Sequence, residues 1–135
     1  MRYALWAAAA YNLAWGAFVV LLPDLPFRWA GMDPPNYPEI WQCLGMVVGV
    51  YGVAYGLAAH LGPVRHWPVV AAGLLGKVLG PVGMASAVAR GTLPPAAAWL
   101  CLFNDLIWWP PFALILLAAY REARRFPTDA RQEDR

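Results

Sequence analysis

The chain has 135 residues, enough for one domain and too few for two. Hydrophobic residues make up 61% of it and charged residues 13%, whereas soluble domains are about half apolar and a quarter charged. Since a soluble fold of this size cannot bury so much apolar surface, composition predicts an integral membrane protein. The net charge of +2 is too small for the basic surface of a nucleic-acid-binding protein, and two cysteines are too few for a disulfide framework.

Four apolar stretches are long enough to cross a hydrocarbon core of ~30 Å, which needs about 20 helical residues. They run at about 3–22, 41–60, 68–89 and 97–120. They are too long, and too uniformly apolar, for the strands of a membrane barrel. We therefore expect an all-α, four-helix membrane bundle over residues 1–120 and a polar cytoplasmic tail over 121–135.

The placement of arginine predicts how the bundle is oriented. Four spans put both termini and the middle loop on one side, whereas the opposite side carries only Arg28 and Arg90. This bias predicts that both termini are cytoplasmic. The arginines on the terminal side are Arg2, Arg65, Arg121, Arg124, Arg125, Arg131 and Arg135.

The segment between the first two spans, 23–40, is the longest connection and is rich in proline. Because proline breaks helices, we expect no long helix there. Its aromatic residues suit the headgroup zone of a membrane, so we expect the loop to follow the outer surface. It is either a partial lid or a plain amphipathic connector.

Two spans carry glycines at helical spacing, which allows close helix packing. At 100° per residue, each set lies on one stripe of its helix. Because a short loop joins these spans, we expect them to be antiparallel neighbours that pack glycine face on glycine face. The alternative is that one face forms a homodimer seam. The two sets are Gly45, Gly49, Gly52 and Gly56, and Gly73, Gly76, Gly80 and Gly83.

Lys77 and Asp105 are charged residues within the third and fourth spans. At 1.5 Å per residue, they lie roughly 14 Å and 18 Å from the cytoplasmic boundary, so we expect them to face each other near the midplane. A lone charge at that depth is costly and usually finds a partner. Asn12 lies at nearly the same depth, and Asn104 is adjacent to Asp105.

These polar residues have two interpretations. They are either structural glue that sets helix register, or a pocket for a lipid headgroup, a quinone-like ring or a proton. Trp108 and Trp109 lie on nearly the same helix face as Asp105, where they either cradle a ligand or simply pack.

The remaining reactive residues match no motif for metal, cofactor or catalysis. Cys43 and Cys101 form no C-x-x-C pair, and we expect two free thiols, with an outer bridge as the alternative. His60 and His66 flank the cytoplasmic loop at a spacing typical of no metal site. The chain has no phosphate-binding loop and no nucleophile elbow, and no cofactor is predicted.

Three segments carry a resemblance to a known group. Tyr11-Asn12-Leu13-Ala14-Trp15-Gly16, Gly73-Leu74-Leu75-Gly76-Lys77 and Asn104-Asp105-Leu106-Ile107-Trp108-Trp109 resemble short bacterial four-span membrane proteins of unknown function, which are DoxX-like in architecture. The resemblance implies a multi-pass protein of the bacterial inner membrane. It implies no activity, because shape does not confer function.

The function that we expect from the sequence is not enzymatic. The chain is interpreted as an accessory membrane subunit or a protein that binds a hydrophobic ligand or lipid through its midplane polar pocket. Its expected partners are the bilayer and either a larger membrane complex or further copies of itself. The alternatives are a small transporter coupled to protons through Asp105, and a membrane enzyme on a lipid or isoprenoid with Asp105 as acid or base.

Overall fold

The computed structural model describes residues 1–125, and that range is helical without a strand. This confirms the all-α prediction. The α-helices are α1 (Arg2–Leu21), α2 (Leu25–Trp29), α3 (Pro38–Leu61), α4 (Trp67–Ala89), α5 (Trp99–Asn104) and α6 (Trp109–Arg125), and the 3-10 turns are η1 (Pro95–Ala98) and η2 (Leu106–Trp108). Residues 126–135, most of the predicted tail, lie outside the described range.

Four helical segments are long and apolar enough to cross a membrane. They overlap the four apolar stretches of the sequence, but the helix of the predicted fourth span continues into the polar residues as far as Arg125. The segments are Arg2–Leu21, Pro38–Leu61, Trp67–Ala89 and Pro95–Arg125.

Proline and glycine set the helix ends. Pro38 begins α3, where the missing N–H of proline costs nothing because the first turn has no acceptor for it. Gly62 and Gly91 follow α3 and α4 with φ angles of 115° and 69°, which glycine adopts without strain. The connection after α1 contains only the short helix α2, as its prolines predict.

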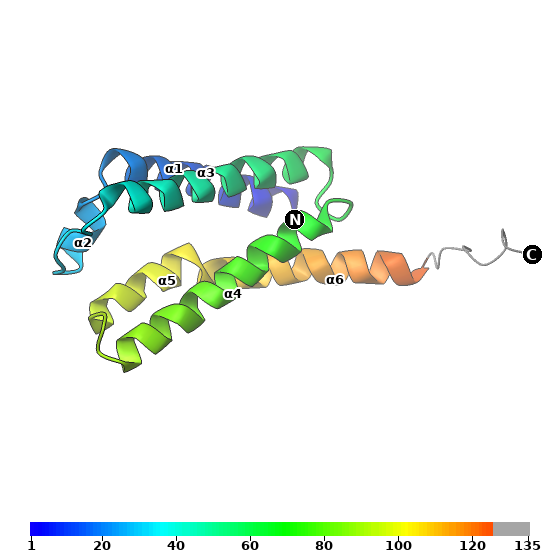
Figure 1. The fold of residues 1–135 in the computed structure, drawn as a ribbon. Coiled ribbons are helices and arrows are strands. Elements are labelled where there is room, and N and C mark those ends of the chain that lie inside the picture. Colours follow the sequence, from blue (N-terminus) through cyan, green and yellow to red (C-terminus); the bar gives the residue numbers. More distant parts are fainter. Residues whose placement is uncertain (126–135) are drawn as a thin grey trace, which may run out of the picture.

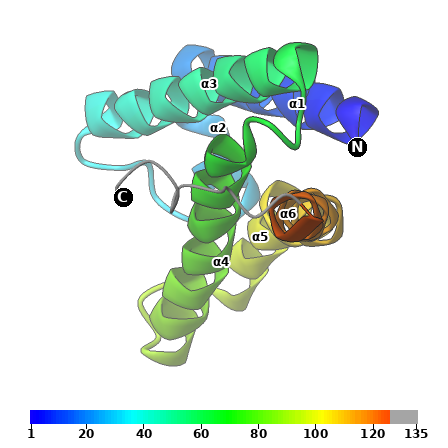
Figure 2. The same cartoon turned by 90° about the vertical axis from the view of Figure 1, so that its right-hand side faces the viewer.

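The helices form two antiparallel pairs that diverge (Figure 1). α1 packs along α3, and α4 packs beside the segment formed by α5 and α6. The second view shows α4 crossing away from the α1–α3 pair (Figure 2). The start of α1, the loop between α3 and α4 and the end of α6 lie toward one end, as the four-span topology requires.

The glycines of α3 contact α1, not α4. A Cβ added to Gly45 would lie 2.8 Å from Cγ1 of Val19, and one added to Gly52 would lie 3.0 Å from the Ala9 carbonyl oxygen. The prediction that the glycine faces of α3 and α4 pack on each other is therefore wrong. The physical reason is that α1 offers its own small residues, including Gly16, whereas tyrosine side chains separate α3 from α4.

The glycines of α4 have a different role. Gly73 accommodates the ring of Tyr55, and Gly80 accommodates the carboxylate of Asp105, whose Oδ2 would lie 3.1 Å from an added Cβ. Two further glycines, Gly76 and Gly83, have open space where a Cβ would point, as does Gly49 of α3. The glycine stripe of α4 thus makes room for side chains instead of a helix backbone.

The hydrophobic core joins the two pairs toward the end that carries the α3–α4 loop. The Tyr55 and Phe112 rings meet edge to face with centroids 5.1 Å apart, and both side chains are fully buried. Leu5, Ala59 and Val70 complete this packing from α1, α3 and α4. Because the core holds only one end, the helix pairs separate toward the other end.

The fourth apolar segment is broken in its middle. α5 ends at Asn104, Asp105 leaves the helical region with φ −125° and ψ −59°, and α6 begins at Trp109. Pro110 and Pro111 cannot donate to the carbonyls four residues earlier, which removes the helical bonds there. The helix of the fourth segment therefore breaks just before the proline pair, whereas α4 continues through Pro81.

Candidate functional site

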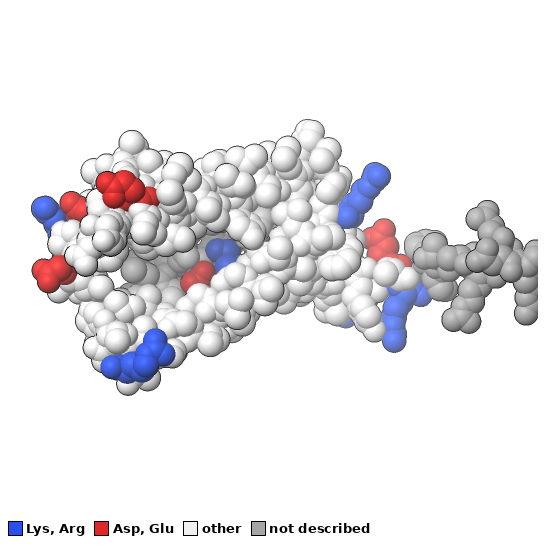
Figure 3. Space-filling model, viewed as in Figure 1, with Lys and Arg blue, Asp and Glu red and all other residues white. Residues whose placement is uncertain are grey.

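A cavity of about 480 Å³ lies where the helix pairs separate. Its volume is within the range of small-molecule sites. In Figure 3 it is seen as a hollow between the α1–α3 pair and α4, with basic and acidic atoms in its wall. The wall is mostly apolar and aromatic, and Lys77 and Asp105 are its only charged residues within the described range 1–125.

Four polar residues that the sequence singled out line this same cavity, and we call them the polar cluster. They come from three of the four apolar segments. Lys77, Asp105 and Asn12 are buried, with 6%, 7% and 3% of their surfaces exposed. The polar cluster is Asn12, Lys77, Asn104 and Asp105.

The ammonium of Lys77 bonds to the broken helix and not directly to a carboxylate. Its Nζ donates to the backbone carbonyl oxygen of Asn104 at 2.6 Å. This carbonyl is available because α5 ends at Asn104, so that no helical N–H follows to take it. Lys77 and Asp105 thus share the cavity, and the bond that the structure describes for Nζ goes to the residue beside Asp105.

The side chains of Asn104 and Asp105 orient each other. Asn104 Nδ2 donates to Asp105 Oδ1 at 3.1 Å, and Gly80 of α4 leaves room for Oδ2. Because this bond fixes the orientation of the amide, Asn104 Oδ1 points away from Asp105. It is buried without a hydrogen-bond partner in the described chain. Asn12 Oδ1 is also buried without a partner.

Trp108 and Trp109 are close to Lys77 but do not line the cavity. Trp109 Nε1 donates to the Lys77 carbonyl oxygen at 3.0 Å. Pro81, four residues after Lys77, cannot make the helical bond to that carbonyl, so the indole takes its place. The Trp108 ring lies 5.9 Å from Lys77 Nζ and stacks obliquely on Tyr11. Both tryptophans therefore contact Lys77 without lining the cavity.

We expect the Trp109 bond to depend on Pro81. Trp109→Phe should lower the free energy of unfolding by about 1–3 kcal/mol, because it leaves a buried carbonyl without a donor. In Pro81→Ala, the restored helical N–H can bond to that carbonyl, so the further change Trp109→Phe should cost less. Unfolding of the four variants in mild detergent measures this coupling, with Trp67→Phe at a half-exposed tryptophan as the control. Strictly additive effects contradict the prediction.

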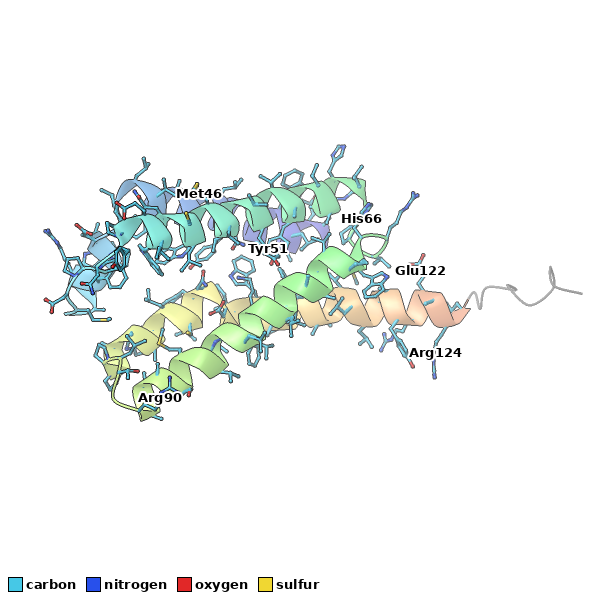
Figure 4. The ribbon with its side chains drawn as sticks, in the orientation of Figure 1. Met46, Tyr51, His66, Arg90, Glu122 and Arg124 are labelled. Carbon is cyan, nitrogen blue, oxygen red and sulfur yellow. The ribbon has the colours of Figure 1, made fainter. Side chains whose placement is uncertain are left out.

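Trp15 and Trp41 also line the cavity, although the sequence did not predict either of them there. The available signal for Trp15 was its position three residues after Asn12, which places both on one face of α1. Tyr51 also lines the cavity and extends from α3 on the side that faces α4 (Figure 4).

The remaining candidate groups form no second site. Cys43 is exposed, Cys101 is buried, and both are free. His66 Nδ1 lies 3.1 Å from the Gly62 carbonyl oxygen in the loop that joins α3 to α4. Within residues 1–125, no group of three His, Cys, Asp or Glu side chains is placed to hold a metal ion.

Comparisons with protein families, with curated proteins and with solved structures find no match to this chain. The resemblance to short bacterial four-span proteins therefore stays a prediction from its sequence segments. What the protein does must be inferred from the cavity and the residues that line it.

Proposed function

We propose that this chain is a multi-pass protein of the bacterial inner membrane that binds one hydrophobic ligand or lipid in its cavity. The observation that carries the proposal is the polar cluster at an otherwise apolar cavity. Concave, mostly apolar sites with a few convergent polar groups are typical of small-molecule binding. Charged and amide groups buried in apolar surroundings are costly, which favours a functional use for them.

The outward faces of the helices support a membrane environment. Val50, Leu75 and Val82 are 67%, 59% and 60% exposed, on helices apolar enough to span a bilayer. Exposed apolar surface on this scale is stable in contact with lipid and unfavourable in water. The arginines near the end of α6 then lie on the cytoplasmic side, together with both termini.

The opening of the cavity favours access from the lipid. Leu44, Val47 and Tyr51 line the cavity from α3 and remain 52%, 53% and 39% exposed. They flank the gap in which α3 and α4 diverge, so a ligand can pass sideways from the acyl-chain region. An apolar molecule using this route never has to enter water.

We further propose that the protein acts as an accessory subunit that holds this ligand for a larger membrane complex or for an oligomer of itself. The open glycine Gly83 supports this role, because a partner helix can approach α4 closely there. The described chain is almost entirely apolar helix and short connections, which suits work done through helix contacts.

The test is to fill the cavity without disturbing the fold. Gly76 lines the cavity and has room for a side chain, whereas Gly83 has room but lies outside the cavity. We expect native mass spectrometry of the purified wild type to show a bound small molecule. Gly76→Phe should remove it, and the matched control Gly83→Phe should retain it. A wild-type protein with nothing bound, or equal binding in both variants, contradicts the proposal.

A proton-coupled transporter is the second candidate, favoured by the break of the fourth segment at Asp105. Discontinuous helices near the midplane are typical of transporter sites, where exposed carbonyls and carboxylates bind the coupling ion. In proteoliposomes, substrate-driven proton flux that is unaffected by Asp105→Asn would eliminate this candidate.

A further inference from the structure

The polar cluster contains buried acceptor atoms that have no hydrogen-bond partner among residues 1–125. Asn12 is 3% exposed, and its Oδ1 has no partner in the described chain. Asn104 Oδ1 has none either, while its Nδ2 is engaged by Asp105. Since a buried polar atom without a partner destabilises the protein, a bound group that supplies donors here is favoured.

The same cluster also offers donors. The Lys77 ammonium has three N–H groups, and the structure uses one of them on the Asn104 carbonyl. Asn12, which also lines the cavity, adds an amide group with two N–H donors. The terminal torsion of asparagine is broad and roughly two-fold, so a half-turn of the Asn12 amide exchanges its oxygen and its nitrogen at the cavity.

The charges of the cluster balance. Lys77 is basic and Asp105 is acidic, and no other charged residue of the described part of the chain lines the cavity. A ligand with a phosphate or carboxylate head would be attracted by the Lys77 ammonium but repelled by the Asp105 carboxylate. A cationic head would be attracted by Asp105 but repelled by Lys77. An excess of either sign on the ligand is therefore disfavoured in this water-poor site.

We infer that the ligand is an uncharged amphiphile with a hydroxyl head and a single apolar chain. This inference rests on the proposed function and specifies its ligand. A hydroxyl donates one hydrogen bond and accepts two, so it can serve an amide oxygen and the ammonium together. An ether, ketone or ester accepts only and leaves the amide oxygens without a donor. The apolar chain then lies along the aromatic wall and leaves between α3 and α4.

The experiment compares two probes of equal chain length in nanodiscs of a phosphatidylcholine, a lipid without a hydroxyl donor. One is a chain-brominated alkan-1-ol, and the other is its methyl ether. Bromine quenches tryptophan fluorescence on contact, and Trp15 and Trp41 line the cavity. We expect the alcohol to bind at least about fivefold more tightly than the ether. Replacing the alcohol by a monoacylglycerol distinguishes a glycerolipid from a free long-chain alcohol as the source of the hydroxyl.

Asn12→Leu removes the unpartnered amide while nearly keeping its shape. It should reduce binding of the alcohol to the level of the ether and leave the ether unchanged, whereas Ala10→Leu, on the exposed face of the same helix, should change neither. If Asn12→Leu fails to fold, Asn104→Leu tests the second amide in the same way.

Equal binding of alcohol and ether overturns the hydroxyl inference while leaving a hydrophobic-ligand protein intact. Stronger binding of an alkanoate or an alkylammonium of the same chain length also overturns it, because the head would then be charged. If no probe binds, the inference and the proposed function fail together.

Discussion

Replacing Gly16 by alanine is expected to lower the free energy of unfolding by about 1–3 kcal/mol, as overpacking of a tight contact does. An added Cβ there would lie 2.6 Å from the Gly45 carbonyl oxygen and 2.9 Å from the Gly49 nitrogen. Both atoms are backbone, so no side chain can turn aside and the helices α1 and α3 must separate. Separation also weakens the contacts of every neighbouring residue along this helix pair.

Gly49→Ala is the matched control, because nothing lies within 4 Å of a Cβ added to Gly49. It should change the free energy of unfolding by a few tenths of a kcal/mol and in the favourable direction, since alanine has the higher helix propensity. Reversible unfolding in mixed micelles, followed by circular dichroism, measures both variants. If the two substitutions have equal effects, α1 and α3 do not pack as the structure describes.

Lys77→Met and Asp105→Asn should each destabilise the protein by about 3 kcal/mol or more, because each leaves a buried charge without its counter-charge. Lys77→Met also leaves the Asn104 carbonyl without its donor. The double variant removes both charges, so its loss should be smaller than the sum of the single losses. A double-mutant cycle on the free energy of unfolding gives the coupling directly.

The same three variants separate a structural pair from a binding site. If the double variant folds well and still binds the ligand, the pair is structural glue, and the polar cluster loses its assigned role. We expect instead that the double variant regains stability but not binding, because methionine and asparagine cannot supply the ammonium donors. Full additivity in the cycle contradicts any electrostatic coupling between Lys77 and Asp105.

Much of the local structure was determined by the sequence itself. Runs of apolar residues long enough for a bilayer form helices, because only an internally bonded backbone is stable in apolar surroundings. Prolines and glycines mark the ends of these helices, as at Pro38 and Gly62, because their backbone preferences act locally. The common depth of Lys77, Asn12 and Asp105 was also predictable, since helical rise converts residue number into height.

The choice of partners was decided only by the tertiary structure. Glycine spacing indicates a helix face that permits close packing, but it does not say which helix packs there. In the structure, the small residues of α1, and not those of α4, pack against the glycines of α3. The Asn104 carbonyl is free to accept a hydrogen bond from Lys77 only because the last segment breaks before its proline pair. The residue at which such a break occurs depends on the packing around it. The cavity likewise arises from the divergence of two helix pairs, a property of their three-dimensional contacts that no local pattern encodes.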